Sequence, residues 1–367
     1  MKVKNLGLFL LVSIILFGVI SCKSTQPAVE PPPPQEDVLD PDLAPPSQSA
    51  LDGLNAAILR TDNARKLVMD FDGPTYFPPE WGTAEGLYNQ AQSQKKTNTV
   101  RDVRESQARY VSAAAAYEAL AEKTIPRYAD DMAAKGYAAR DKAIVAGAVY
   151  WADDLLLECD NSALDTIALY EAKDYYKSRD AAFKTLDMYN ALGEGVEALK
   201  LRVEIEEKDF VRYDPANIAA ADDIAISALD DYDRQDFAAI LTKAIDVRAR
   251  YNQSLNKAKE SYASDCAAAA AAERQRALDL KANVAVKQAY DAANDIFNQG
   301  AAASRARNFD NASSLYIQSR DLFIAVTADA RERRRIAEEA LREAEQKMVQ
   351  SDETAQRAEL IIEGGAR

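Results

Sequence analysis

The segment that decides the fold is "YDPANIAAADDIA", residues 213–225, because "YFPPEWGTAEGLY" at 76–88 repeats its Tyr, its Pro and the spacing between them. Proline suits the first turn of a helix, where its missing N–H is not needed and its fixed backbone angle favours helix entry. After each Pro, small and apolar residues recur every three or four positions, which is the pattern of one helix face. The repeated segment therefore predicts the first helix of a recurring two-helix unit.

Such helix-face patterns, which we call ladders, recur in pairs along the chain. Each ladder has members at positions 0, 3, 7 and 10: Trp81, Ala84, Tyr88 and Ala91 with Tyr110, Ala113, Tyr117 and Leu120; Ile218, Ala221, Ala225 and Ala228 with Phe237, Ile240, Ala244 and Val247; Tyr290, Ala293, Phe297 and Gly300 with Phe309, Ala312, Tyr316 and Ser319. A fourth pair is indicated at 169–183, where Tyr170, Asp174 and Tyr175 match the spacing of Tyr232, Asp236 and Phe237. Alternating apolar runs are almost absent after residue 51, so the sequence predicts an all-α chain.

Two further features support the pairing of helices. A small residue nine positions before the aromatic of the second ladder allows close helix approach, as Ala228 does before Phe237 and Gly300 before Phe309. In three of the four pairs the residue immediately before the aromatic is Asp174, Asp236 or Asn308, and each of these side chains suits the N-cap of a helix. We therefore expect tight hairpins between the members of each pair.

The segment "QGAAASRARNFDNASSLYIQS", residues 299–319, carries Gly300, Phe309, Ala312 and Tyr316 at the positions typical of tetratricopeptide-like repeats. The chain resembles that family over about 78–325, strongly in this unit and loosely in three others. This resemblance implies an irregular α-solenoid of helix pairs, because the units are 60 to 72 residues apart instead of in strict tandem. Repeats of this kind serve binding, and the predicted repeat domain spans 51–326.

The N-terminus has the pattern of a secretory signal, with Lys2 and Lys4 followed by an apolar run from Leu6 to Ile20. The run is shorter than the roughly 20 residues of a membrane-spanning helix. Residues 19–22, "VISC", resemble the bacterial lipobox, which implies cleavage before Cys22 and lipid attachment to it. An ordinary signal peptide with an incidental Cys22 is the alternative interpretation. We expect residues 1–22 to be a lipoprotein signal peptide.

Residues 23–50 contain the run Pro31–Pro34 and the pair Pro45–Pro46, which favour extended backbone and predict a disordered, acidic tether. Lipobox, tether and helical repeats together resemble envelope lipoproteins of spirochaetes. The resemblance implies a bacterial cell-envelope location, lipid-anchored to a membrane and facing the periplasm.

Composition excludes several function classes. The net charge of −14 becomes −16 without residues 1–22, and such a surface repels nucleic acid and anionic lipid headgroups. The absence of histidine excludes Ser-His-Asp and Cys-His catalysis and most zinc sites, so we expect no enzyme, metal or cofactor. Apart from Cys22, only Cys159 and Cys266 remain, either as two buried thiols or as one disulfide.

Two local patterns suggest ligand sites but fail on spacing. Asp231, Asp233 and Asp236 lack the Gly and Glu of a calcium loop at the sixth and twelfth positions. Gly193 and Gly195 fit a dinucleotide pattern, but a predicted helix precedes them where a strand is required. Tyr170 and Tyr232, at equivalent positions of two units, are the candidate groove-binding residues, with packing as the alternative role.

Residues 327–367 are rich in charged side chains and carry a narrow seam of mostly small residues at alternating spacings of four and three. This seam predicts a helix that is either solvated or part of a weak coiled coil. The seam is Ala337, Leu341, Ala344, Met348, Ser351, Ala355, Ala358 and Ile362. A homodimer through this helix is therefore one possibility.

From these features the expected function is a membrane-anchored scaffold that binds an envelope protein through its helical repeats. The alternatives are a solute-binding auxiliary subunit of a transporter and a structural spacer between membrane and cell wall.

Overall fold

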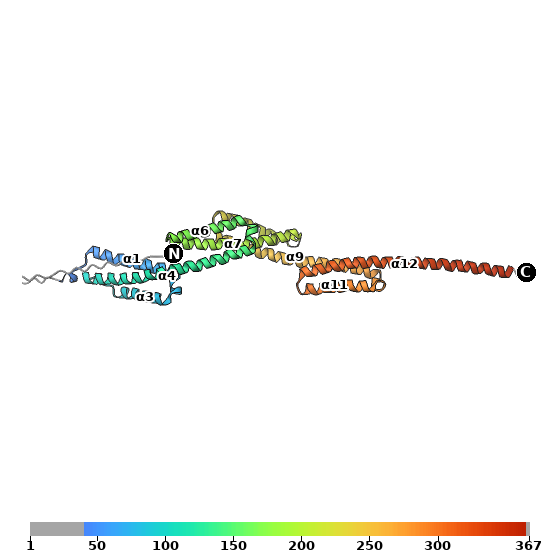
Figure 1. Cartoon of the computed structure of the whole chain (residues 1–367), viewed down its shortest axis with the longest axis horizontal. Coiled ribbons are helices and arrows are strands. Elements are labelled where there is room, and N and C mark those ends of the chain that lie inside the picture. The colour runs from blue at the N-terminus through green and yellow to red at the C-terminus, as the bar shows by residue number, and fades with distance from the viewer. Residues whose placement is uncertain (1–39, 365–367) are drawn as a thin grey trace, which may run out of the picture. The chain divides into compact units, whose positions relative to one another are not determined.

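The computed structural model describes residues 40–364, and every regular element within them is helical (Figure 1). In chain order the elements are η1 Pro41–Leu43, α1 Gln48–Asp70, α2 Gly73–Tyr76, α3 Pro78–Ser93, α4 Val100–Ala146, α5 Ala148–Trp151, α6 Asp153–Glu171, α7 Tyr175–Glu207, η2 Val211–Tyr213, α8 Pro215–Asp233, α9 Phe237–Asp279, α10 Ala282–Ala285, α11 Lys287–Arg305 and α12 Phe309–Gly364. The prediction of an all-α chain is confirmed. Residues 1–39, and with them Cys22 and the proposed signal, lie outside the described residues.

The described part of the predicted tether, residues 40–50, carries structure. It contains η1, and α1 begins at Gln48 with the Ser47 side chain accepting a hydrogen bond from the Ala50 N–H. Asp40 forms a 2.9 Å ion pair with Arg101 of α4, and Asp42 pairs with Arg104. These ion pairs hold the segment just before α1 against the first turns of α4.

The described chain forms two compact units, which divide between Ala121 and Glu122 within α4. A core cluster of the first unit contains Leu54 and Ala57 of α1, Ala91 of α3, and Val103 and Tyr110 of α4. The second unit has several such clusters, and its long helices α7 and α9 each contribute to more than one of them.

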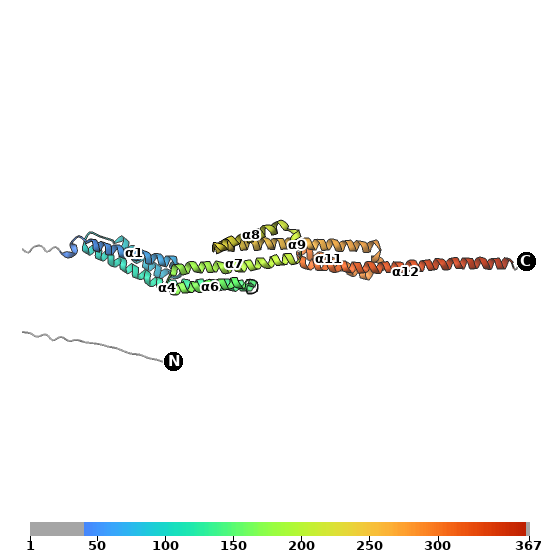
Figure 2. The ribbon, with the colours of Figure 1, turned by 90° about the horizontal axis from the view of Figure 1, so that it is seen from above.

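The order of elements repeats along the chain. A long helix is followed by a one-turn helix, a helix of 16 to 19 residues, a loop of three to six residues and the next long helix. The short helices α3 and α8 begin at Pro78 and Pro215, as the sequence predicted. In the second unit α6 packs on α7, α7 on α9, and α8 on α9, so α7 lies between α6 and α8 (Figure 2).

The ladders mostly face the core. Tyr110, Ala113, Tyr117 and Leu120 are all buried, as are Ala312, Tyr316 and Ser319. Ala225 of α8 is exposed, because it borders a cavity described below. Gly300 lies against the Tyr316 ring, where an added Cβ would come within 3.0 Å of the ring. The small residue thus allows α11 and α12 to approach closely.

Three of the four predicted hairpins have loops of one backbone geometry, whereas the expected tight hairpin between α3 and α4 is instead the longer segment 94–99. Lys173, Gln235 and Arg307 each adopt a left-handed φ, of 61°, 57° and 58°. In each loop the next residue donates its N–H to the carbonyl five positions earlier, which satisfies the end of the preceding helix. Asp236 and Asn308 then cap the following helix with their side chains. Asp174 makes no such cap and pairs with Lys177 instead.

An arginine, a carboxylate and a tyrosine meet at one level of three successive helices. Arg140 of α4 binds both oxygens of Asp160 of α6 at 2.7 and 2.8 Å, and the Tyr189 hydroxyl of α7 donates to Asp160 Oδ1 at 2.6 Å. The same cluster recurs as Arg65, Glu85 and Tyr117 and as Arg202, Asp222 and Tyr251. The arginine precedes the acid by 20 residues in all three. We call each set an Arg–acid–Tyr cluster.

A fourth set occupies the corresponding positions in α9, α11 and α12 but has lost the charge pair. Its members are Arg274, Asn294 and Phe323, with the same spacing of 20 and 29 residues as in the second and third clusters. Arg274 Nε and Asn294 Oδ1 are buried and have no hydrogen-bond partner, and Phe323 is fully buried. Since unsatisfied buried polar atoms cost free energy, this set is a weak point of the fold.

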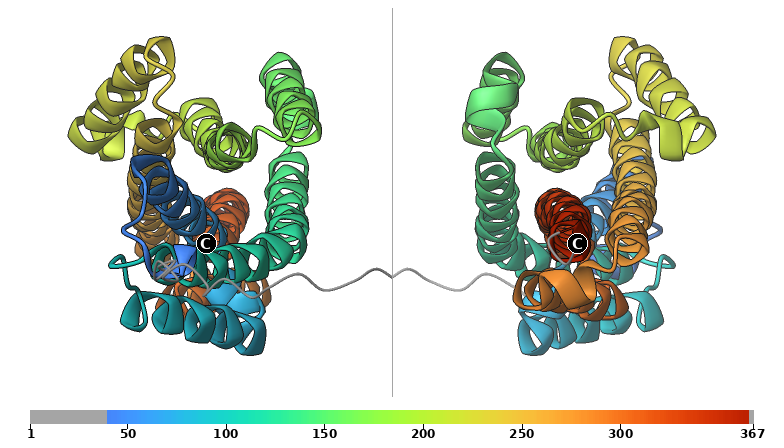
Figure 3. Two further views of the ribbon diagram at one scale, coloured as in Figure 1. Left: turned by 90° about the vertical axis from the view of Figure 1, so that its left-hand side faces the viewer. Right: turned by 90° about the vertical axis from the view of Figure 1, so that its right-hand side faces the viewer.

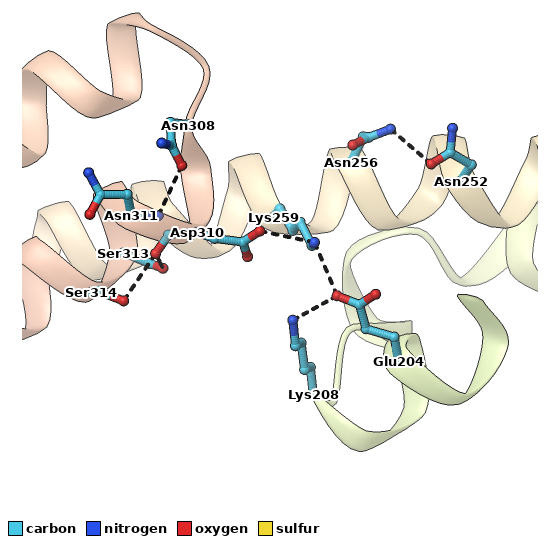
Figure 4. Close-up of polar contacts among 10 residues, drawn as sticks. All are labelled: Glu204, Lys208, Asn252, Asn256, Lys259, Asn308, Asp310, Asn311, Ser313 and Ser314. Carbon is cyan, nitrogen blue, oxygen red and sulfur yellow. Dashed lines mark hydrogen bonds and ion pairs between the residues drawn. The ribbon is translucent and has the colours of Figure 1, made fainter. Parts of the chain in front are cut away.

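Lys259 of α9 joins helices of neighbouring core clusters in the second unit. Its ammonium lies 3.0 Å from Glu204 of α7 and 3.0 Å from Asp310 at the start of α12 (Figure 4). Burial opposes the charge on Lys259, but its two carboxylate partners raise its pKa overall. The contact ties α7 and α12 to the same turn of α9.

Asp160→Asn should lower the free energy of unfolding at neutral pH by about 1–3 kcal/mol, because it removes a carboxylate that accepts charged hydrogen bonds. Arg140 and Tyr189 hold the pKa of Asp160 below its ordinary value. The stabilisation is therefore complete above the unfolded-state pKa of about 3.9 and is lost as pH falls through the lower folded-state pKa. Urea unfolding followed by circular dichroism between pH 7 and low pH measures this difference. Asp165→Asn, an exposed carboxylate on the same helix, is the control; an equal effect of both variants would contradict the structural role of the cluster.

Asn294→Asp should raise the stability of the chain by about 1 kcal/mol at neutral pH, since a carboxylate there gives the buried Arg274 Nε an acceptor. Asn298→Asp adds the same charge at an exposed position of α11 and should leave stability nearly unchanged. The measurement is again urea unfolding. A loss of stability in Asn294→Asp would show that the fourth set is not a depleted Arg–acid–Tyr cluster.

Candidate functional site

A cavity of about 440 Å³ lies in the second unit, lined by residues from Trp151 to Tyr251. Its walls come from α6 and α8, and from α7 and α9, which pack on each other; the end views in Figure 3 show α7 between α6 and α8. On α7 the lining extends from Met188 to Arg202, which is about 21 Å at 1.5 Å per helical residue. The cavity is therefore elongated along the helices, and its volume is within the usual range of ligand sites, about 300–1,000 Å³.

The cavity is apolar and open to solvent. Its deepest side chains, including Leu192 and Val196 of α7 and Phe237 of α9, are buried. Large apolar residues at its edge are exposed: Trp151 by 45%, Leu155 by 45%, Leu199 by 42% and Tyr232 by 39%. Exposure of such residues around one opening is uncommon on a surface that stays in water, and it indicates a binding surface.

Small residues leave this space open. Ala191 and Gly195 of α7 and Ala225 and Ala228 of α8 line the cavity at positions where larger side chains would fill it. A Cβ added at Gly195 would meet no atom within 4 Å outside the local backbone. Gly in the middle of a helix also costs about 1 kcal/mol relative to Ala. Packing alone therefore gives no reason for glycine at this position.

The charged side chains that line the cavity, Glu158, Arg202 and Lys243, have partners within the protein. Arg202 belongs to the third Arg–acid–Tyr cluster. Lys243 lies 2.6 Å from Asp231 and donates to the Ser227 carbonyl at 2.9 Å, and this lysine lowers the pKa of Asp231. Glu158 of α6 accepts a hydrogen bond from the Tyr232 hydroxyl of α8 and so links the two walls. The interior of the cavity is therefore mainly apolar.

Cys159 and Cys266 are both free, buried thiols, which decides between the two interpretations of the sequence. Cys159 borders the cavity, and burial together with Glu158 and Asp160 raises its pKa to about 12. The thiol therefore stays protonated at neutral pH, and Cys159 contributes to the cavity as an apolar side chain.

The two candidate tyrosines lie in different places. Tyr232 lines the cavity, at the C-terminal end of α8. Tyr170 lies near the C-terminal end of α6, away from the cavity, and packs on Tyr175 with ring centroids 5.7 Å apart. Cys22, the predicted lipid site, lies outside the described residues.

Sequence reasoning did not identify most of the cavity. Trp151, Leu155 and Leu199 do not belong to any ladder. Large apolar residues outside the predicted buried face of a helix were the signal that could have identified them. Gly195 attracted attention only as part of a dinucleotide pattern, but α7 runs through it without a break. The small ladder residues Ala225, Ala228 and Ala244 were predicted as core, and they line the cavity instead.

Within residues 40–364, no group of three or more His, Cys, Asp or Glu side chains is arranged to hold a metal ion. No helix in that part of the chain is long and apolar enough to cross a membrane. The chain matches none of the protein-family models, curated proteins or solved structures with which it was compared.

Proposed function

We propose that this protein is a scaffold that binds a segment of a partner protein in the elongated cavity between α6 and α8. The observation that carries the proposal is the open, apolar cavity with exposed Trp151, Leu155 and Leu199 at its edge. A cavity about four helical turns long matches a helix that inserts side chains along one face. Helical arrays commonly use such concave surfaces for binding.

We further propose that the helices form an irregular α-solenoid of tetratricopeptide-like pairs. The recurring element order, the three hairpins of one geometry and the recurring Arg–acid–Tyr cluster support this arrangement. In it, α9 contributes Tyr251 to one core cluster and Cys266 to the next. Each long helix would thus contribute core residues to two neighbouring repeats.

The proposal includes lipid attachment at Cys22 and a location in the bacterial envelope, facing the periplasm. It rests on the sequence "VISC" at 19–22 and on the charged, apolar and small-residue order that precedes the cysteine. Cys22→Ala should move the protein from the membrane fraction to the soluble fraction of cell extracts. Continued detergent partitioning of this variant would contradict the anchor.

Photo-crosslinking in intact cells tests the scaffold function. A photo-reactive amino acid at Leu155 should give a discrete adduct with a partner protein, and the same residue at exposed Leu59 of α1 should not. A Cβ added at Gly195 meets no atom within 4 Å, so Gly195→Leu should direct its side chain into the cavity and abolish the adduct.

Gly136→Leu is the matched control for this experiment, since a Cβ there also meets no atom within 4 Å but the position lies in α4, away from the cavity. It should preserve the adduct. If Leu155 and Leu59 capture the same abundant proteins, or if Gly195→Leu leaves the adduct unchanged, the cavity does not bind a partner.

The C-terminal part of α12 supports a second proposal, a parallel homodimer. Burial along α12 ends at Ala330, and all residues from Arg331 to Ile361 are exposed. In the heptad pattern Leu341, Met348 and Ala355 occupy a positions. A parallel pair would place Arg333 opposite Glu338 and Lys347 opposite Asp352 of the second copy, whereas an antiparallel pair would bring like-charged e positions together.

The purified protein should therefore show the mass of a dimer in light scattering, decreasing to a monomer on dilution. Leu341→Glu combined with Met348→Glu should give a monomer at all concentrations, because both charges fall in the seam. Gln346→Glu with Gln350→Glu adds the same charge on the opposite side of the helix and should keep the dimer. A wild-type protein that is monomeric at high concentration would exclude this interface.

A further inference from the structure

We infer that the segment bound in the cavity is a basic amphipathic helix, with apolar residues on one face and Lys or Arg beside them. This inference rests on the proposed function, because it names the chemistry of the partner at the same site. It comes from the charge of α6 and α8, the two helices on either side of the cavity.

The two short helices beside the cavity, α6 and α8, carry acidic side chains and no basic ones, whereas the charged side chains that line the cavity itself are Glu158, Arg202 and Lys243. α6 contains six Asp or Glu residues and no Lys or Arg, and α8 contains five Asp residues and no Lys or Arg. The rest of the chain mixes the two signs, since it holds all 45 basic residues and 48 of the 59 acidic ones. The two short helices on either side of the apolar cavity therefore have the most one-sided charge in the second unit.

Most of these carboxylates have no basic partner within the described chain. Asp160, Asp222 and Asp231 are paired with Arg or Lys. The exposed acids that form no ion pair are Asp153, Asp154, Asp165 and Glu171 of α6 and Asp223, Asp230 and Asp233 of α8. Internal pairing thus neutralises three of these carboxylates and leaves seven exposed on α6 and α8, none of which lines the cavity itself.

Several of these acids oppose folding. Asp230 and Asp233 lie in the last turn of α8, where the partial negative charge of the helix end repels carboxylates. At the same end of the cavity, burial and the nearby Asp236 raise the pKa of Asp187, which precedes the lining residue Met188. Negative charge is therefore concentrated where it costs stability, and a cationic partner would relieve this cost.

The shape of the cavity favours a helix over a compact ligand. Lining residues run from Met188 to Arg202 on α7 and from Phe237 to Tyr251 on α9, about four turns on each helix. An inserted helix would place apolar side chains at i, i+3, i+4 and i+7 on this floor. Its flanking cations would then be attracted by the net negative charge of α6 and α8, whose unpaired acids include Asp153, Asp154, Asp230 and Asp233. An acyl chain would use the same apolar floor but would not be attracted by this charge.

Fluorescence anisotropy with designed peptides tests the inference. The probe is a labelled amphipathic peptide of about 18 residues with Leu at the helical apolar positions and Lys elsewhere. Two counterparts carry Glu or Gln in place of every Lys. The Lys peptide should bind at least about tenfold more tightly than the Glu peptide, and this preference should weaken with added salt.

Four variants of the purified full chain separate specific binding from general attraction to an acidic protein. Gly195→Leu leaves the net charge unchanged and should weaken binding of the Lys peptide by about tenfold or more, while Gly136→Leu should not. Replacing Asp153, Asp154, Asp230 and Asp233 by Asn should weaken binding by about tenfold at low salt. Replacing Glu343, Glu345, Asp352 and Glu353 of α12 by their amides removes as many charges and should have little effect.

Three results would overturn the inference. Equal binding of the Lys, Gln and Glu peptides would show that charge does not select the partner, and undiminished binding to Gly195→Leu would place the peptide outside the cavity. Binding of dodecyl maltoside monomers, with no binding of the Lys peptide, would assign the cavity to an acyl chain. If these results appear while Leu155 still crosslinks a partner in cells, only the charge inference fails; if the crosslink is also absent, the proposed function fails with it.

Discussion

The fold depends on one interaction, the Arg–acid–Tyr cluster, which fixes three helices at a common level. Arg140 reaches Asp160 from one helix and Tyr189 reaches it from another, so each carboxylate oxygen has a charged or hydroxyl donor. Helices rich in alanine make few specific contacts, since their small side chains allow sliding and rotation. A bidentate charged contact supplies the register that the apolar surface does not. The charged side chains Arg140 and Asp160 are only partly buried, which limits the cost of removing them from water.

Much of the architecture could be predicted from sequence because it rests on local rules. Pro78 and Pro215 mark helix starts, and the 0, 3, 7, 10 ladders mark buried faces. The tight loops were located by their neighbours, yet their left-handed residues Lys173, Gln235 and Arg307 gave no signal, since glycine is the usual marker. The charged clusters escaped notice because their members are 20 and about 30 residues apart on three helices.

The candidate site was harder to predict, because a cavity is an absence of side chains. Ala225, Ala228 and Gly195 have the pattern of a packed face, and nothing in the sequence shows that no neighbour reaches them. Tyr232 was identified by its equivalence to Tyr170, and each ring packs on the aromatic residue five positions later, Phe237 and Tyr175, but only Tyr232 also borders the cavity. The difference arises because Tyr232 stands where α8 faces α6 across the cavity, whereas Tyr170 packs within the α6–α7 hairpin.

Helix α12 passes from the buried core to the exposed extension without a loop. Ala330 is the last buried residue, and the same helix continues to Gly364. Successive residues of an α-helix are separated by about 100° of rotation, so the angular position of every side chain on the extension is set by the bundle that anchors it. Inserting a single residue near Arg331 would turn the whole apolar seam by that angle, whereas a seven-residue insertion would nearly restore it. The rotational position of the exposed part of α12 is thus fixed by the packing of its buried N-terminal part.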